Sequence, residues 1–100
     1  MSTDHRKLLT IVTEAALEGR LVSEIERLGA HGYTVADVRG KGGRGVRAGG
    51  WNLSANIRIE VICTQDTAIA IAAALKENYY DNYAMILFIG EVEVLRPEKF

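Results

Sequence analysis

The order of strand-like and helix-like segments leaves this chain few possible folds. Apolar runs and apolar–polar alternation predict strands near residues 7–13, 33–39, 56–61 and 84–94. Apolar residues at helical spacing predict helices near 17–28 and 65–78, the second with Thr64 as its N-cap. The order β-α-β-β-α-β is that of the ferredoxin-like sandwich, an α+β fold with two helices on one face of a sheet. The sequence therefore predicts a single domain over residues 1–100.

The last predicted strand carries apolar side chains on both of its faces. Because side chains alternate along a strand, Met85, Leu87 and Ile89 share one face. The residues that share the other face are Ile86, Phe88 and Val92. One layer of helices covers only one face of a sheet, so we expect an oligomer that packs the uncovered faces together.

Length, composition and charge argue against membrane, secreted and nucleic-acid-binding proteins. With 100 residues, of which 48% are apolar and 25% charged, the chain can bury one hydrophobic core. Its formal net charge of −1 offers no general attraction to nucleic acid or to anionic membranes. There is no apolar run of the roughly 20 residues that span a bilayer, no signal-peptide pattern, and only one cysteine, Cys63. We therefore expect a cytoplasmic protein without membrane insertion or nucleic-acid binding.

A glycine-rich segment, residues 40–53, connects the second and third predicted strands and holds six of the ten glycines. No acidic residue occurs between Val38 and Ile59, whereas this stretch contains Arg39, Lys41, Arg44, Arg47 and Arg58. Glycine lets backbone N–H groups converge on an oxyanion, and arginine adds charge-assisted donors. The pattern predicts a site for phosphate or carboxylate; a flexible, solvated hairpin tip is the alternative.

Residues 32–44, in which Gly-Tyr-Thr-Val leads into Gly-Lys-Gly-Gly-Arg, resemble the PII signalling proteins at the start of their long T-loop. The similarity is greater to PII-like proteins linked to inorganic carbon, which are associated with bicarbonate transporters or carboxysomes. The segments similar to this subgroup are 12–14 (VTE), 40–47 (GKGGRGVR), 55–60 (ANIRIE) and 79–84 (YYDNYA). The resemblance identifies residues 1–100 as one PII-like domain with a T-loop at about 40–53.

The resemblance implies a signalling protein and not an enzyme. Family members form trimers and bind adenine nucleotides in clefts between subunits, and the nucleotide rearranges the T-loop for contact with a partner. The effectors implied here are ADP, AMP or ATP, with cyclic AMP and bicarbonate as further candidates, and no cofactor. The implied partners are the other subunits of a homotrimer and a bicarbonate transporter or carboxysome component. The protein would then regulate inorganic carbon metabolism.

Carried over residue by residue, the resemblance implies a nucleotide site in three parts. The phosphate would be held by Gly40, Lys41, Gly42, Arg44 and Arg47. The residues expected around the ribose or base are Thr13, Glu14 and Asn56. Arg58 shares a strand face with Asn56 and either joins the anion site or pairs with Glu60. The residues implied to close the cleft from the next subunit are Tyr83, Ala84 and Met85.

The chain departs from ordinary PII proteins in three ways. Residues 81–84 (DNYA) replace the lysine-bearing B-loop, and Trp51 is the only aromatic residue of the loop at 40–53. These changes argue against 2-oxoglutarate sensing and against uridylylation. The chain ends at Phe100 without the cysteine-bearing extension of the transporter-linked members, which favours a carboxysome-associated type.

Other reactive residues have simpler explanations. His5 and His31 lack a second ligand at metal spacing, so we expect surface histidines and no metal site. Cys63 ends an apolar strand and is expected to be a buried thiol. We expect no catalytic residue, although slow hydrolysis of a nucleotide phosphate at the glycine-rich loop is one alternative function. A protein-docking module without nucleotide is a second, and the RNA-binding and amino-acid-binding domains of similar topology are less favoured.

Overall fold

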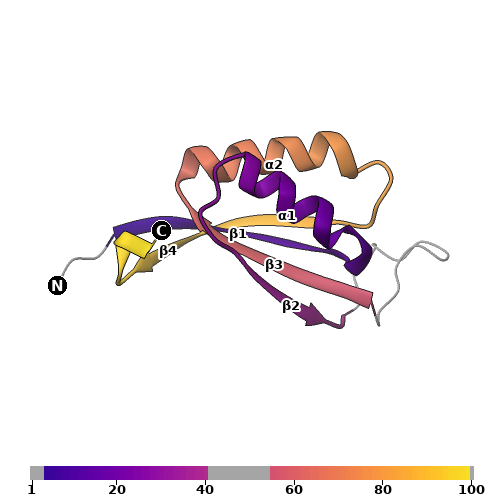
Figure 1. The fold of residues 1–100 in the computed structure, drawn as a ribbon, viewed down its shortest axis with the longest axis horizontal. Helices are drawn as coiled ribbons and strands as arrows, with labels where there is room; N and C mark the ends of the chain where they lie inside the picture. The colour runs from indigo at the N-terminus through magenta and orange to yellow at the C-terminus, as the bar shows by residue number, and fades with distance from the viewer. Residues whose placement is uncertain (1–3, 41–54, 100) are drawn as a thin grey trace.

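The computed structural model describes residues 4–40 and 55–99 (Figure 1). Within these residues the sheet has the order β2-β3-β1-β4, and every pair of neighbouring strands is antiparallel. The elements are β1 (Asp4–Glu14), η1 (Ala15–Leu17), α1 (Glu18–Arg27), β2 (Thr34–Val38), β3 (Asn56–Cys63), α2 (Gln65–Tyr79), β4 (Ile86–Val94) and η3 (Pro97–Lys99). The predicted ferredoxin-like order is therefore confirmed. The predicted long loop at 40–53 lies outside the described residues, apart from Gly40.

The predicted boundaries differ from the observed ones mainly in the two long strands. β1 begins at Asp4, three residues before the predicted start, because Asp4 pairs with Val94 at the far end of β4. β4 begins at Ile86 and not at Ala84, since the Ala84 carbonyl accepts a hydrogen bond from the Thr13 hydroxyl at 3.0 Å. The N-cap prediction is confirmed, because the Thr64 hydroxyl accepts a hydrogen bond from the Thr67 N–H at 3.3 Å.

The hydrophobic core lies between the sheet and the two helices, which cover the same face (Figure 1). Strand register places Leu9 opposite Val61 and Ile11 opposite Ile59, so alternate residues of the two central strands point to the helices. The apolar side chains exposed by 2% or less are Leu9, Ile11, Ile57, Ile59 and Val61 from the sheet and Leu17, Leu21, Ile25, Ala68, Ile71 and Leu75 from the helical layer. This core holds the strand ends that build the site described below.

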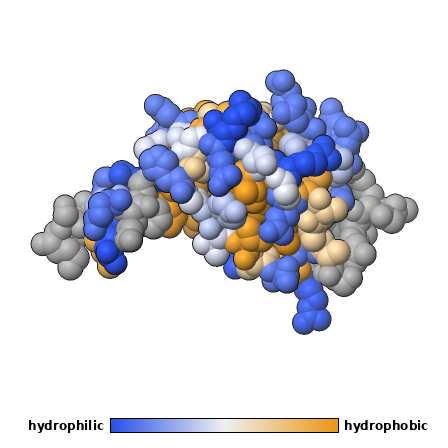
Figure 2. Space-filling model, viewed as in Figure 1, coloured by the Kyte–Doolittle hydropathy of each residue, from blue (hydrophilic) through white to orange (hydrophobic). Residues whose placement is uncertain are grey.

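Among residues 4–40 and 55–99, no helix covers the second face of the sheet, as the sequence predicts. Phe88 and Ile86 lie opposite Thr10 and Val12 on this face and are 55% and 43% exposed. Met85 and Leu87 pack against the core on the helical side, as expected from their alternation. Exposed side chains of the helical layer are largely hydrophilic in Figure 2, and apolar ones reach the surface beneath it, along the sheet. Assembly through the uncovered face stays a prediction.

The molecule is long, with extents of 50 × 23 × 21 Å. The N-terminal part of β1 and the C-terminal part of β4 form a two-stranded ribbon that extends beyond the helices, and both termini lie there (Figure 1). The connection from α2 to β4 and the ends of β2 and β3 lie at the opposite end. Among the described residues, no helix has the length and apolar character needed to cross a membrane.

Candidate ligand-binding site

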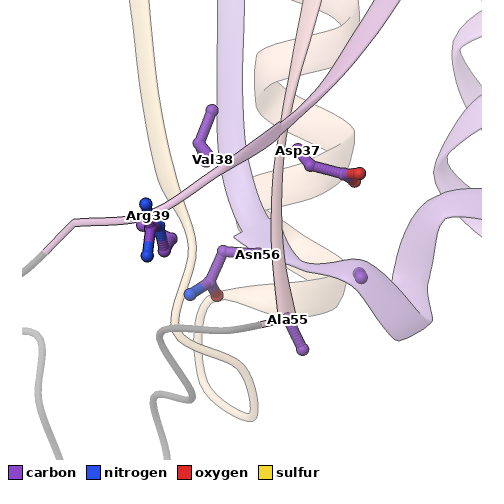
Figure 3. Close-up of a pocket in the computed structure, with 6 residues that line it drawn as sticks. Asp37, Val38, Arg39, Ala55 and Asn56 are labelled. Atoms are coloured by element: carbon purple, nitrogen blue, oxygen red, sulfur yellow. The ribbon is translucent and has the colours of Figure 1, made fainter.

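A pocket of about 430 Å³ opens where β2 ends and β3 begins (Figure 3). The antiparallel pairing of Val38 with Asn56 holds the two strand ends together, so the chain entering and leaving the glycine-rich segment is fixed at this point. The residues that line the pocket are Ala15, Asp37, Val38, Arg39, Ala55 and Asn56. A concave site of this size is in the range of small-ligand pockets.

The polar groups of the pocket differ in burial and direction. Asn56 is only 4% exposed, and its position in β3 is fixed by ladder partners on both sides, Glu14 and Val38. Arg39 follows the last residue of β2 and is exposed to solvent. In the close-up, the Asp37 carboxylate points away from both Arg39 and Asn56 (Figure 3). The side that holds Arg39 and Asn56 therefore combines a cation with an amide that can donate and accept hydrogen bonds.

The end of β1 joins this pocket to the connection between α2 and β4. Thr13 is fully buried, and its hydroxyl donates to the Ala84 carbonyl oxygen at 3.0 Å. The next residue, Glu14, pairs with Asn56, and the one after it, Ala15, lines the pocket. This hydrogen bond holds the α2–β4 connection beside the pocket wall, so Thr13 has a structural role.

The chain matches the family model described as Nitrogen regulatory protein P-II over residues 6–99. It belongs to the P-II family. A protein assigned as a PII-like signalling protein from Thermus thermophilus is 41% identical, with a TM-score of 0.85 over 100% of this chain and 99% of that one. The PII-like resemblance and the α+β fold predicted from the sequence are therefore confirmed.

Two structures of the PII-like protein CPII from Thiomonas intermedia share the fold. One, bound to ADP, AMP and acetate, is 23% identical, with a TM-score of 0.80 over 100% of this chain and 98% of that one. The other, bound to ADP and bicarbonate, is 24% identical, with a TM-score of 0.82 over 99% of this chain and 97% of that one.

The structure of this P-II protein brings together only part of the predicted site. Glu14, Asn56 and Thr13 meet at the paired ends of β1 and β3, and Ala84 touches Thr13. Arg58 is on the same side of β3 as Asn56 but is not among the described residues that line the pocket, and its Nε is 3.4 Å from a carboxylate oxygen of Glu60. Of the two predicted roles of Arg58, the isolated chain therefore shows the ion pair with Glu60. The predicted phosphate ligands outside the described residues are Lys41, Gly42, Arg44 and Arg47.

Three predicted residues remain to be placed, and the pocket also contains residues that the sequence did not suggest. Gly40 is exposed, Tyr83 is half-buried, and Met85 packs against the core. The pocket is also lined by residues that the sequence analysis did not assign to the site: Ala15, Asp37, Val38 and Ala55, together with Arg39, which it named only within the basic stretch. Asp37 lies two residues before Arg39 in the sequence, and the structure places it with Ala15 in the lining of one pocket. Within the described residues there is no group of three or more His, Cys, Asp or Glu side chains able to hold a metal ion.

Proposed function

We propose that this P-II protein is a non-enzymatic sensor of adenine nucleotides that binds ADP or AMP in the pocket at the ends of β2 and β3. Bicarbonate is a candidate second ligand, as are ATP and cyclic AMP. The nucleotide would rearrange the loop at 40–53, which then contacts a protein partner. A bicarbonate transporter or a carboxysome component is the partner that the resemblance favours, with regulation of inorganic carbon metabolism in the cytoplasm as the outcome.

The observation that carries the proposal is the position of the pocket. It lies where both ends of the loop at 40–53 are held, beside Arg39 and the buried amide of Asn56. Lys41, Arg44 and Arg47 follow directly in the sequence, with no acidic residue up to Ile59. A polyanionic ligand in the pocket would therefore meet cations from the loop, and charge-assisted hydrogen bonds to phosphate are among the strong ones. CPII, which shares the fold, is known bound to ADP, AMP and bicarbonate.

The proposal includes a homotrimer in which the cleft is completed by a neighbouring subunit. An uncovered sheet face with exposed Phe88 and Ile86 supports assembly, because large apolar patches on a monomer are uncommon. Tyr83, Ala84 and Met85 would then close the cleft. In the isolated chain this segment is attached to its own β1 through Thr13, so its position is set before any neighbour arrives.

Calorimetric titration of the purified protein with AMP, ADP, ATP and cyclic AMP, each with and without bicarbonate, tests the proposal. We expect micromolar or tighter binding of at least one adenylate. Because each arginine–phosphate contact is charge-assisted, Arg44→Ala or Arg47→Ala should raise its Kd by about ten- to a hundredfold. Arg96→Ala is the control, since Arg96 is exposed, pairs with Glu98 and lies beyond the end of β4.

Each other outcome points to one of the alternative functions. If no adenylate binds, the sensor proposal is wrong, and the loop is better explained as a protein-docking element. Steady release of phosphate from ATP, abolished by Arg44→Ala, would indicate a slow phosphohydrolase instead. A bicarbonate-dependent change in adenylate affinity would connect the site to inorganic carbon, because coupling between two ligands is reciprocal.

A further inference from the structure

Arg20, Tyr79 and Tyr83 form a cluster, here called the Arg20 clamp, that joins α1 to the end of α2 and the connection beyond it. The Arg20 Cζ atom lies 5.5 Å from the centroid of the Tyr79 ring and 5.9 Å from that of the Tyr83 ring. The two rings are 5.7 Å apart and tilted by 51°. Arg20 also donates a hydrogen bond from Nη1 to the Tyr83 hydroxyl oxygen at 3.4 Å. One guanidinium thus touches two aromatic rings within cation–π range.

The clamp acts on a segment that is already fixed at its two ends. The N–H groups of Asn82 and Tyr83 both donate to the Tyr79 carbonyl oxygen, at 3.1 and 3.0 Å. Beyond the turn, the Ala84 carbonyl accepts the hydrogen bond from Thr13 described above. The Tyr83 side chain reaches across to α1, so Arg20 adds a side-chain attachment to a connection that its backbone bonds already hold.

Arg20 itself lies outside the hydrophobic core, whereas Tyr79 is a buried member of that core and Tyr83 packs against it. Arg20 is exposed, whereas the core residues of α1 are its neighbour Leu21 and Ile25. The hydrogen bond with Tyr83, together with the nearby tyrosine oxygens, raises the pKa of Arg20 above its ordinary value. Replacing Arg20 therefore removes contacts to the connection without opening a cavity in the core.

We propose that Arg20 is a positioning residue for the nucleotide site: by holding Tyr79 and Tyr83 it keeps the connection from Tyr80 to Met85 in its binding arrangement before the ligand arrives. This inference rests on the proposed function. The connection reaches the pocket through Thr13, whose neighbour Glu14 pairs with the pocket residue Asn56. A connection ordered in advance does not lose that conformational entropy during binding, which raises affinity.

The test compares Arg20→Met with Arg27→Met in the full chain. Arg27 is on the same helix, is exposed and pairs with Glu24, but has no contact in the clamp, so it is a matched control. Hydrogen exchange of the Asn82 and Tyr83 amides reports the order of the connection, and calorimetry with ADP reports affinity. Arg20→Met should accelerate exchange of these two amides and weaken ADP binding. Each lost cation–π contact should raise the Kd roughly two- to fivefold. The control should leave both unchanged.

Two further variants separate positioning from general stability. Tyr83→Phe keeps the ring and loses only the hydroxyl, so we expect a smaller effect than in Arg20→Met, and Arg20→Lys should restore part of the affinity. The thermal midpoint and the exchange of α1 amides should stay near wild type in all three.

The possible failures are distinguishable. If wild type binds ADP and Arg20→Met binds it with equal affinity and unchanged amide exchange, the inference is wrong and the proposed function remains intact. A wild type that binds no adenylate overturns both. Weaker binding accompanied by a matching loss of global stability also overturns it, because Arg20 would then support the fold and not the site.

Discussion

The single thiol shows how a residue of reactive type becomes part of the fold. Cys63 ends β3 opposite Lys7 and is only 4% exposed, with its Sγ 4.0 Å from the Val61 carbonyl oxygen. Burial disfavours the thiolate and raises the pKa of Cys63 above its ordinary value. Because the thiolate is the reactive form, the thiol is protected both by its position and by its protonation.

Ellman's reagent should therefore label native protein much more slowly than unfolded protein at about pH 8, near the ordinary pKa of a thiol. The folded pKa is the higher one, so the stability contributed by the neutral thiol is full below the unfolded pKa of about 8.5 and is lost as pH rises through the folded value. Denaturant unfolding from neutral to alkaline pH should show this decline, and Cys63→Ala should have a shallower alkaline slope. Equal labelling rates for native and unfolded protein would contradict the burial.

At the scale of the element, α2 depends on a defined start. Thr64 is in an extended conformation, and its hydroxyl accepts the hydrogen bond from the Thr67 N–H, one of the four amides that a helix leaves without internal partners. The helix that begins here supplies Ile71 and Leu75 to the core and ends at Tyr79, a member of the Arg20 clamp. The cap thus contributes to the placement of the α2–β4 connection.

Replacing Thr64 with alanine removes this cap. We expect a loss of about 1 kcal/mol in the free energy of unfolding, the usual cost of deleting a capping hydroxyl. Thr64→Ser keeps the hydroxyl and should stay near wild type, so the pair isolates the hydrogen bond from side-chain size. Urea unfolding curves with equal m-values measure the difference; the cap has no energetic role if the alanine and serine variants unfold together.

At the scale of the whole molecule, the uncovered sheet face is the surface through which we propose that the chain assembles. Its apolar residues on β4 lie beside Thr10 and Val12, with the ion pair of Arg58 and Glu60 farther across the sheet. Burying a charged pair in an interface requires that both partners stay satisfied, and here the pair is already made within one chain. In the proposed trimer, Arg58 and Glu60 would therefore stay paired with each other when this face is covered.

A charge placed on this face should prevent assembly. Phe88→Glu puts a carboxylate at a position that is 55% exposed in the isolated chain and buried in the proposed trimer. We expect analytical ultracentrifugation to find trimers for wild type and monomers for the variant at micromolar concentration. Ile69→Glu is the control, because Ile69 is 52% exposed on α2, in the helical layer. A wild-type monomer would contradict the prediction, as would a trimeric Phe88→Glu variant.

The periodicity of apolar residues was sufficient to predict the order of the strands and helices and the buried face of β3. Ile57, Ile59 and Val61 alternate with polar residues, and this alternation alone predicts which side of β3 enters the core. The Thr64 cap could also be predicted, because capping is an interaction between residues close in sequence. The order of the elements predicted the ferredoxin-like fold, and the resemblance of segments such as 32–44 to PII proteins implied the family.

Contacts between distant segments were decided only by the tertiary structure. Thr13 and Ala84 are 71 residues apart, and Arg20 and Tyr83 are 63 apart, so no local pattern relates them. The same holds for Ala15 beside the paired ends of β2 and β3. Hydrophobic periodicity predicts which face of an element is buried, because the face of each residue follows from its position along the helix or strand. Which side chains meet at the end of a sheet depends on strand order and register, and these are set by the packing of the whole chain.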